Sequence, residues 1–406
     1  MMLVGIIATI LVVGGAATAA IYSSETIDFA RGATTTPEKI DQKPAERPVD
    51  PYVTHVATPV PMKAIYMSQC AAGTPSFRED LTNLIDTTEL NAIIIDIRDY
   101  TGRISFPTDN PLLEGMTSDK CGAKDMKEFI KELHAKNIYV IGRITVFQNP
   151  YYTSLHPDQA VQRKSGGVWK DNKGLAFVDV GAKPYWETVV ALAKESYNIG
   201  FDELNFDYIR YPSDGPMSEA QYNWSEGKSK PQALEEFFAY LHEELKGTGM
   251  KTSADLFGMV TTNTDDLNIG QVLERALPYF DYIAPMVYPS HYPKGFHGYT
   301  DVNANAYNIV KFAMTEAVRR TTATTSKVDA MTHTRIGTST PALYSKPAYP
   351  ASKMRPWIQS FDYPVPYTPV MVAEQLKAMR DSGLDSYYVW DPANKYRSLR
   401  AILSTE

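Results

Sequence analysis

Hydrophobic and polar residues alternate along the stretch Gly200–Pro212, which reads Gly-Phe-Asp-Glu-Leu-Asn-Phe-Asp-Tyr-Ile-Arg-Tyr-Pro. Side chains of a strand alternate between two faces. One face here is apolar and the other carries acids and an amide: Leu204, Phe206 and Tyr208 against Glu203, Asn205 and Asp207. Such a strand suits a parallel barrel, which packs outward on helices and turns its last inward residues toward an active-site mouth. The alternative, an edge strand with solvated acids, is disfavoured by the aromatic residues around Asp207.

Seven further stretches have strand patterns, and helical periodicity follows each strand. The predicted strands are Lys63–Ser68, Asn91–Asp99, Ile138–Phe147, Glu203–Ile209, Lys251–Phe257, Tyr282–Tyr288, Arg355–Phe361 and Ser386–Trp390. The predicted helices are Ser76–Asp86, Lys124–Lys136, Pro184–Tyr197, Gln232–Lys246, Ile269–Leu277, Ala306–Arg319, Pro369–Ser382 and Asn394–Leu403. Eight strand–helix units predict an α/β fold, a (β/α)8 TIM barrel. A doubly wound open sheet is the alternative, but no glycine-rich phosphate loop follows the first strand.

Two segments precede the predicted barrel, which spans residues 62–406. Residues 1–24 carry no charged side chain, and Met2–Ile21 is apolar or small throughout. This leader is a cleaved signal peptide or a membrane anchor through residues 2–21, and either would place the barrel outside the cytoplasm. Residues 25–61 are rich in proline and threonine, which favours an extended linker.

Composition narrows the possible partners and chemistries. The net charge is −7 with no basic block, so nucleic acid is an unexpected partner. The seven histidines show no zinc-hydrolase spacing, and the chain has no Gly-x-Ser-x-Gly elbow. We therefore expect neither a metal nor a cofactor.

Polar residues recur where the predicted strands end, and the strand ends of a barrel meet at one face. Lower barrel layers favour branched apolar side chains, so we expect the charged residues in the upper layer. The candidate substrate-binding residues are Asp96, Arg98, Asp99, Arg143, Asn205, Arg210, Tyr288, His291, Trp357, Gln359, Trp390 and Asp391.

Asp207 and Asp255 end neighbouring predicted strands, and they are the candidate catalytic pair. Glycoside hydrolysis needs two carboxyl groups, one a proton donor and the other a nucleophile or base. A nearby arginine could keep one carboxyl ionised while burial raises the pKa of the other. The alternative is a structural ring of ion pairs that closes the top of the barrel.

Four motifs carry a resemblance to a known family. They are Phe201–Pro212, Asp281–Tyr292, Arg355–Phe361 and Asp96-Ile97-Arg98-Asp99. Together they resemble a family of TIM-barrel glycoside hydrolase domains formerly catalogued as a domain of unknown function, over about Met62 to Leu403. The resemblance implies an exported glycosidase-like barrel with sugar-polymer substrates. By analogy with amylase-like barrels it makes Asp207 the nucleophile and Asp255 the acid. Those enzymes usually have Glu in place of Asp255, so Asp99 and Asp391 are alternative acids.

Two functions follow from these patterns. The first is a secreted or membrane-anchored glycoside hydrolase acting on a polysaccharide or glycoconjugate. The alternative is a non-catalytic carbohydrate-binding barrel displayed at the cell surface. Cys70 and Cys121 fall in loops after adjacent predicted strands, so we also expect a disulfide, since export permits oxidation.

Overall fold

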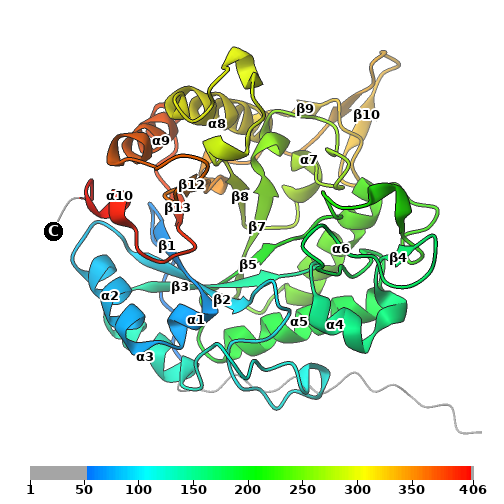
Figure 1. Ribbon diagram of the computed structural model, residues 1–406. Helices are drawn as coiled ribbons and strands as arrows, with labels where there is room; N and C mark the ends of the chain where they lie inside the picture. The colour runs from blue at the N-terminus through cyan, green and yellow to red at the C-terminus, as the bar shows by residue number, and fades with distance from the viewer. Residues whose placement is uncertain (1–52, 404–406) are drawn as a thin grey trace, which may run out of the picture. The chain divides into compact units, whose positions relative to one another are not determined.

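The computed structural model describes residues 53–403, and these form a closed parallel barrel (Figure 1). The barrel strands are β1 (Lys63–Met67), β2 (Ala92–Arg98), β3 (Tyr139–Thr145), β5 (Glu203–Asp207), β7 (Lys251–Phe257), β8 (Tyr282–Met286), β12 (Trp357–Gln359) and β13 (Tyr387–Trp390). β1 pairs with both β2 and β13, so the first and last strands close the ring. The TIM-barrel prediction is confirmed, and closure excludes the open sheet.

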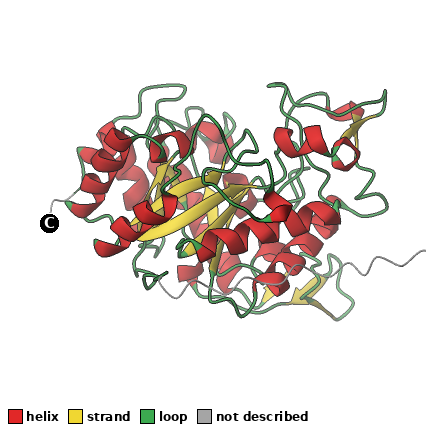
Figure 2. Ribbon diagram, turned by 90° about the horizontal axis from the view of Figure 1, so that it is seen from below, coloured by secondary structure: helices red, strands yellow, loops and turns green. Residues whose placement is uncertain are grey.

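Helices surround the strands on all sides of the barrel axis, as Figure 2 shows. They are α2 (Pro75–Asp86), α3 (Met126–Ala135), α5 (Lys183–Asn198), α6 (Lys230–Leu245), α7 (Leu273–Ala276), α8 (Ala306–Thr322), α9 (Pro369–Asp381) and α10 (Arg397–Arg400). One apolar core lies between strands and helices, and a second fills the barrel interior. No helix in residues 53–403 is long and apolar enough to cross a membrane. The predicted leader lies outside the described residues.

Two of the helices are shorter than the periodicity predicts. The predicted helix Ile269–Leu277 is reduced to α7 because Gly270, with φ +85°, sits in a left-handed conformation that a helix does not accept. The last helix begins only at Arg397, because Asn394 and Tyr396 both have positive φ. In each case a tight turn replaces the first helical residues.

Long loops on the barrel carry the remaining elements. Short helices α1 (Gln69–Ala72) and α4 (Pro150–Leu155) follow β1 and β3. Strands β4 (Gln162–Arg163) and β6 (Ala220–Gln221) pair, joining the loops after β3 and β5. A separate antiparallel sheet before β12 contains β9 (Thr325–Ser326), β10 (Thr334–Ile336) and β11 (Leu343–Ser345).

The lower barrel interior differs from the expectation that charges belong only to the upper layer. Glu203, at the start of β5, forms a buried ion pair with Arg355 at 2.9 Å. The hydroxyls of Tyr139 and Tyr388 donate to the two carboxylate oxygens of Glu203 at 3.2 and 3.1 Å. The charge is tolerated there because both of its oxygens have partners.

Residues 53–61, the described end of the predicted linker, lie against the N-terminal ends of the strands. The N–H of Val56 donates to Asp202 Oδ1 at 2.7 Å, just before β5. His55 stacks on Tyr197 with ring centroids 4.0 Å apart, and Thr58 Oγ1 contacts Tyr139 Oη at 3.2 Å. The chain therefore enters the barrel across its lower end.

Candidate active site

One arginine in the upper barrel interior contacts three carboxylates from different strands. Arg143 Nη1 donates to Asp96 Oδ1 at 2.6 Å, Nη2 donates to Asp207 Oδ2, and Nε lies 3.8 Å from Asp255 Oδ2. All four side chains are buried. Burial alone would lower the pKa of Arg143, but the charges of Asp207 and Asp96 raise it well above its ordinary value. We call these four residues the carboxylate cluster.

Asp207 ends β5 at a sharp change in backbone direction. The next residue, Tyr208, has φ +52°, which stops the strand and brings its N–H to 2.5 Å from Asp207 Oδ1. Asp207 Oδ2 accepts hydrogen bonds from Nε, at 3.2 Å, and Nη2 of Arg143. Both carboxylate oxygens therefore face N–H donors, one of them cationic, which is the stronger kind of hydrogen bond.

Asp255, on β7, is the most deeply buried acid of the cluster at 1% exposure. Its Oδ1 accepts two hydrogen bonds, from Trp357 Nε1 at 2.7 Å and from Asn205 Nδ2 at 2.8 Å. Burial raises the pKa of Asp255 well above its ordinary value, and the charge of Asp207 raises it further. Because Oδ1 already accepts two N–H donors, the proton of the neutral acid belongs on Oδ2, which faces the cluster.

The two candidate catalytic carboxyls are close neighbours. Asp207 Oδ2 lies 3.2 Å and Asp255 Oδ2 3.8 Å from the same Nε of Arg143, so the two oxygens are at most about 7 Å apart. This falls within the span that glycoside hydrolases use between their two carboxyl groups.

Asp96, on β2, has a different environment from the other two acids. Tyr66 Oη donates to Asp96 Oδ2 at 2.5 Å, and Arg143 binds the other oxygen. Burial raises the pKa of Asp96 to about 6, against the opposing effect of Arg143. Sequence reasoning missed Tyr66, since every residue of β1 after Lys63 is apolar and the pattern does not tell which face turns inward.

Aromatic rings enclose the carboxylate cluster. Trp390 stacks on Tyr66 with centroids 3.9 Å apart, and the guanidinium of Arg143 lies 4.9 Å from the Trp390 centroid. Trp357 meets Trp390 edge-on at 5.5 Å. Burial raises the pKa of Tyr288 well above its ordinary value, with further contributions from the charges of Asp255 and Asp207. Tyr288 therefore lies close enough to the cluster to feel both acids.

Three predicted site residues have contacts outside the cluster. Arg98 is fully buried, with Nε donating to the backbone oxygen of Thr145 at 2.9 Å and its guanidinium 5.6 Å from the ring of Tyr185 in α5. Asp99 accepts from the N–H and hydroxyl of Thr101 in its own loop. Asp391 accepts from three backbone N–H groups, those of Ala393, Lys395 and Tyr396.

Arg210, His291 and Gln359 lie around the top of the barrel. Arg210 donates to the oxygen of Tyr211 at 3.0 Å, and the ring centroids of Tyr208 and Phe257 lie 4.8 and 4.7 Å from its guanidinium. His291 is exposed and contacts the ring of Tyr288 at 5.3 Å. Gln359 is fully buried beneath the loops that follow β8 and β12.

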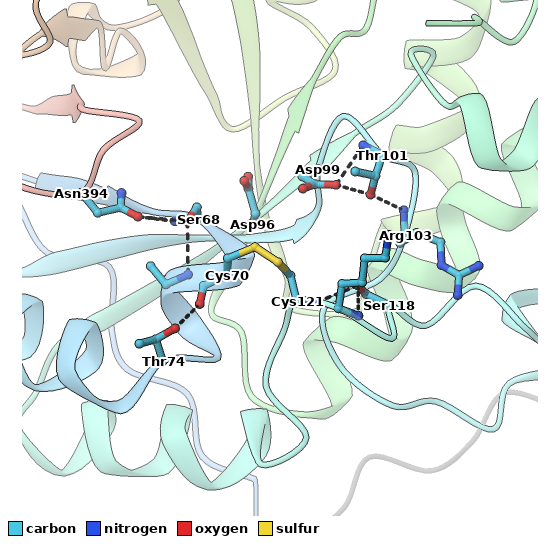
Figure 3. The surroundings of a disulfide bond; sticks show 12 residues. Ser68, Cys70, Thr74, Asp96, Asp99, Thr101, Arg103, Ser118, Cys121 and Asn394 are labelled. Carbon is cyan, nitrogen blue, oxygen red and sulfur yellow. Dashed lines mark hydrogen bonds between the residues drawn. A yellow bond between two sulfur atoms is a disulfide. The ribbon is translucent and has the colours of Figure 1, made fainter.

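A disulfide joins the loops above β1 and β2 (Figure 3). Cys70 and Cys121 have Cα atoms 4.4 Å apart, and their bond closes a separation of 51 residues. Ser68, which caps α1 beside Cys70, also contacts Asn394 at 3.0 Å and so links these loops to the one after β13. Figure 3 shows Asp96 and Asp99 close to this bond. In residues 53–403 no group of three or more His, Cys, Asp or Glu side chains could hold a metal ion.

Solved structures share the fold. The glycoside hydrolase domain of PgaB (BpsB) from Bordetella bronchiseptica has a TM-score of 0.57 and 13% identity, covering 84% of this chain and 99% of that one. The glycoside hydrolase domain of PelA from Pseudomonas aeruginosa has a TM-score of 0.44 and 11% identity, covering 82% and 96%. A hypothetical protein from Ruminiclostridium thermocellum ATCC 27405 is 32% identical over 46% of this chain and 96% of that one, with a TM-score of 0.42.

No curated protein sequence matches this chain. A family model described as "Putative glycosyl hydrolase domain" matches residues 64–396, which is nearly the whole barrel including the carboxylate cluster. The motifs singled out in the sequence lie within this range, so the predicted resemblance is confirmed. The chain belongs to this family of glycosyl hydrolase domains.

Proposed function

We propose that this protein is a glycoside hydrolase acting on an extracellular polysaccharide or glycoconjugate through paired carboxyl groups. The observation that carries the proposal is the pair Asp207 and Asp255, whose Oδ2 atoms both lie near Nε of Arg143. Their environments differ: Asp207 contacts a cation and a backbone donor, whereas burial favours the neutral form of Asp255. Two carboxyls with opposed protonation states are what acid-assisted glycoside cleavage needs.

The contacts suggest a role for each acid. Asp255 donates its Oδ2 proton to the glycosidic oxygen as the bond from that oxygen to the anomeric carbon breaks. Asp207 then either attacks the anomeric carbon or takes a proton from the attacking water. The alternative acids, Asp99 and Asp391, accept hydrogen bonds within their own loops. Asp255 is therefore the better proton donor.

A screen of labelled glycans tests the proposal. Wild type, Asp207→Asn and Asp255→Asn are compared, with Asp99→Asn as the matched control because its carboxylate contacts only its own loop among the hydrogen bonds described. We expect turnover by wild type and the control, and a loss of at least about 10²-fold in the two cluster variants, as for removal of an acid or base. Equal turnover by wild type and Asp207→Asn would exclude Asp207.

One observation favours a non-catalytic carbohydrate-binding barrel as a second candidate. Arg143 already contacts all three acids of the cluster, as a structural ion-pair ring would. This candidate predicts saturable glycan binding without product, and binding that Asp255→Asn leaves unchanged. Product formation lost in Asp255→Asn would exclude it.

We also propose that the barrel works outside the cytoplasm, secreted or anchored through residues 2–21. The disulfide between Cys70 and Cys121 supports this location, because such bonds persist in oxidising compartments. Fractionation of cells that express a C-terminally tagged chain tests it. Recovery of the tag in the cytoplasmic fraction with both thiols free to alkylation would contradict it.

A further inference from the structure

A path of aromatic rings leads from the carboxylate cluster to the surface, across the loops that follow β8 and β12. Tyr288, beside the cluster, contacts Phe361 edge-on at 5.5 Å. His291 contacts Phe361 at 6.0 Å and Tyr363 at 6.2 Å. Exposure increases along the path, from Tyr288 at 6% through half-buried Phe361 to Tyr363 at 57%. We call these four residues the aromatic rim.

One buried amide holds both loops of the aromatic rim. Gln359 Oε1 accepts from the N–H and the hydroxyl of Ser290, at 3.3 and 2.8 Å, and the same hydroxyl contacts His291 Nδ1 at 2.9 Å. Gln359 Nε2 donates to the backbone oxygens of Phe361 and Tyr363, both at 3.1 Å. The amide of Gln359 uses both its oxygen and its nitrogen to fix backbone that carries exposed rings.

A second buried amide fixes Gln359 itself. Gln375 of α9 accepts from the Gln359 N–H and donates to the Gln359 oxygen, both at 2.9 Å. Both glutamines are fully buried. Two amides that tie exposed rings to a helix and a strand reduce the freedom that those rings would lose on binding, which is how a site is preorganised.

We propose that the aromatic rim is a subsite for a sugar unit adjacent to the bond that is cleaved, so that the substrate is a glycan chain rather than a single glycoside. The inference deepens the proposed function and rests on it. Exposed rings with polar edges suit sugars, which present apolar C–H faces bordered by hydroxyls. The rim is continuous with the cluster through Tyr288, so one chain can contact both.

The test compares short and long oligomers. The probes are cello-, chito-, xylo- and malto-oligosaccharides of two and six units on a glycan array. Each is presented to wild type, Tyr363→Ala, Tyr363→Trp and Tyr100→Ala. Tyr100, after β2, is the matched control, because it is 58% exposed and lies over another part of the barrel. Turnover of any bound oligomer is measured alongside.

We expect Tyr363→Ala to weaken hexamer binding about tenfold and dimer binding little, while Tyr363→Trp restores the hexamer and Tyr100→Ala resembles wild type. Hexamer binding that is equal in wild type and Tyr363→Ala would overturn the rim, even if hydrolysis occurs. Length-dependent binding lost in Tyr363→Ala without any hydrolysis would support the rim and refute the proposed enzyme. Retention of no oligomer by wild type would overturn both.

Discussion

Replacing Asp96 by asparagine should make the protein more stable at neutral pH, although Asp96 forms an ion pair. Burial raises the pKa of this carboxyl from 3.8 to about 6. A folded-state pKa above the unfolded value means that the protonated form is favoured in the fold, so stability is greatest below pH 3.8. It declines as pH rises through 6. A difference of about 2.2 between the two pKa values corresponds to about 3 kcal/mol.

The amide introduced by Asp96→Asn resembles the protonated acid in shape, and Arg143 keeps its contact with Asp207. The variant should therefore match wild type near pH 4 and exceed its free energy of unfolding by about 3 kcal/mol above pH 6. Urea unfolding followed by tryptophan fluorescence at pH 4, 5, 6 and 7 measures this difference. If both proteins lose stability in parallel over this range, or if Asp96→Asn is the weaker at pH 7, the reasoning is wrong.

Asp202 provides a control of opposite sign at the other end of the barrel. Burial would raise its pKa, but hydrogen bonds from His134, His55 and the N–H of Val140 lower it below 3.8. Its contribution to stability is present above pH 3.8 and is lost as pH falls through the lower folded value. Asp202→Asn should therefore be less stable than wild type at pH 7, and this deficit should shrink below about pH 4.

Three further variants test the rest of the site. Cys70→Ser removes the cross-link over 51 residues and should lower the free energy of unfolding by about 4 kcal/mol; urea midpoints should show this difference only without reductant, and an equal difference with reductant would contradict it. Trp357→Phe removes an N–H donor to Asp255, so the alkaline limb of the pH–rate profile should move to higher pH. An unmoved limb, as expected for the control Trp390→Phe, would exclude Asp255 as the acid. Arg143→Met leaves buried acids without their cation and should lose about 3–5 kcal/mol at pH 7 and less at pH 4; a deficit independent of pH, measured by urea unfolding, would contradict the pairing.

The barrel was predictable because its signals are local. Runs such as Ala92–Ile95 are apolar on both strand faces, as parallel strands buried on both sides require, and all eight predicted strands occur. Alternation also places Asn205 and Asp207 on the inward face of β5, where both contact partners in the barrel interior. Element ends were less predictable, since single left-handed residues such as Tyr208 and Tyr396 decide them.

The site was less predictable than the fold because small irregularities redirect side chains. Alternation from Asp96 would turn Arg98 toward the cluster, but the pairing of β2 with β3 shifts register between these two residues, and Arg98 instead packs near Tyr185. The burial of Asp255 behind Trp357 joins β7 and β12, residues about a hundred positions apart in the chain. No local pattern reports such a contact.

The entry of the chain at the lower end of the barrel has a practical consequence. Val56 and Thr58 contact the N-terminal side of the strands, whereas Asp207 and the aromatic rim lie at the C-terminal side. A surface that immobilises the protein by way of residue 53 would hold it from the side opposite the carboxylate cluster. Capture through an N-terminal tag is therefore the suitable geometry for a biosensor that presents the barrel to soluble polymers, while a tag inserted into the loops after β8 or β12 would compete with them.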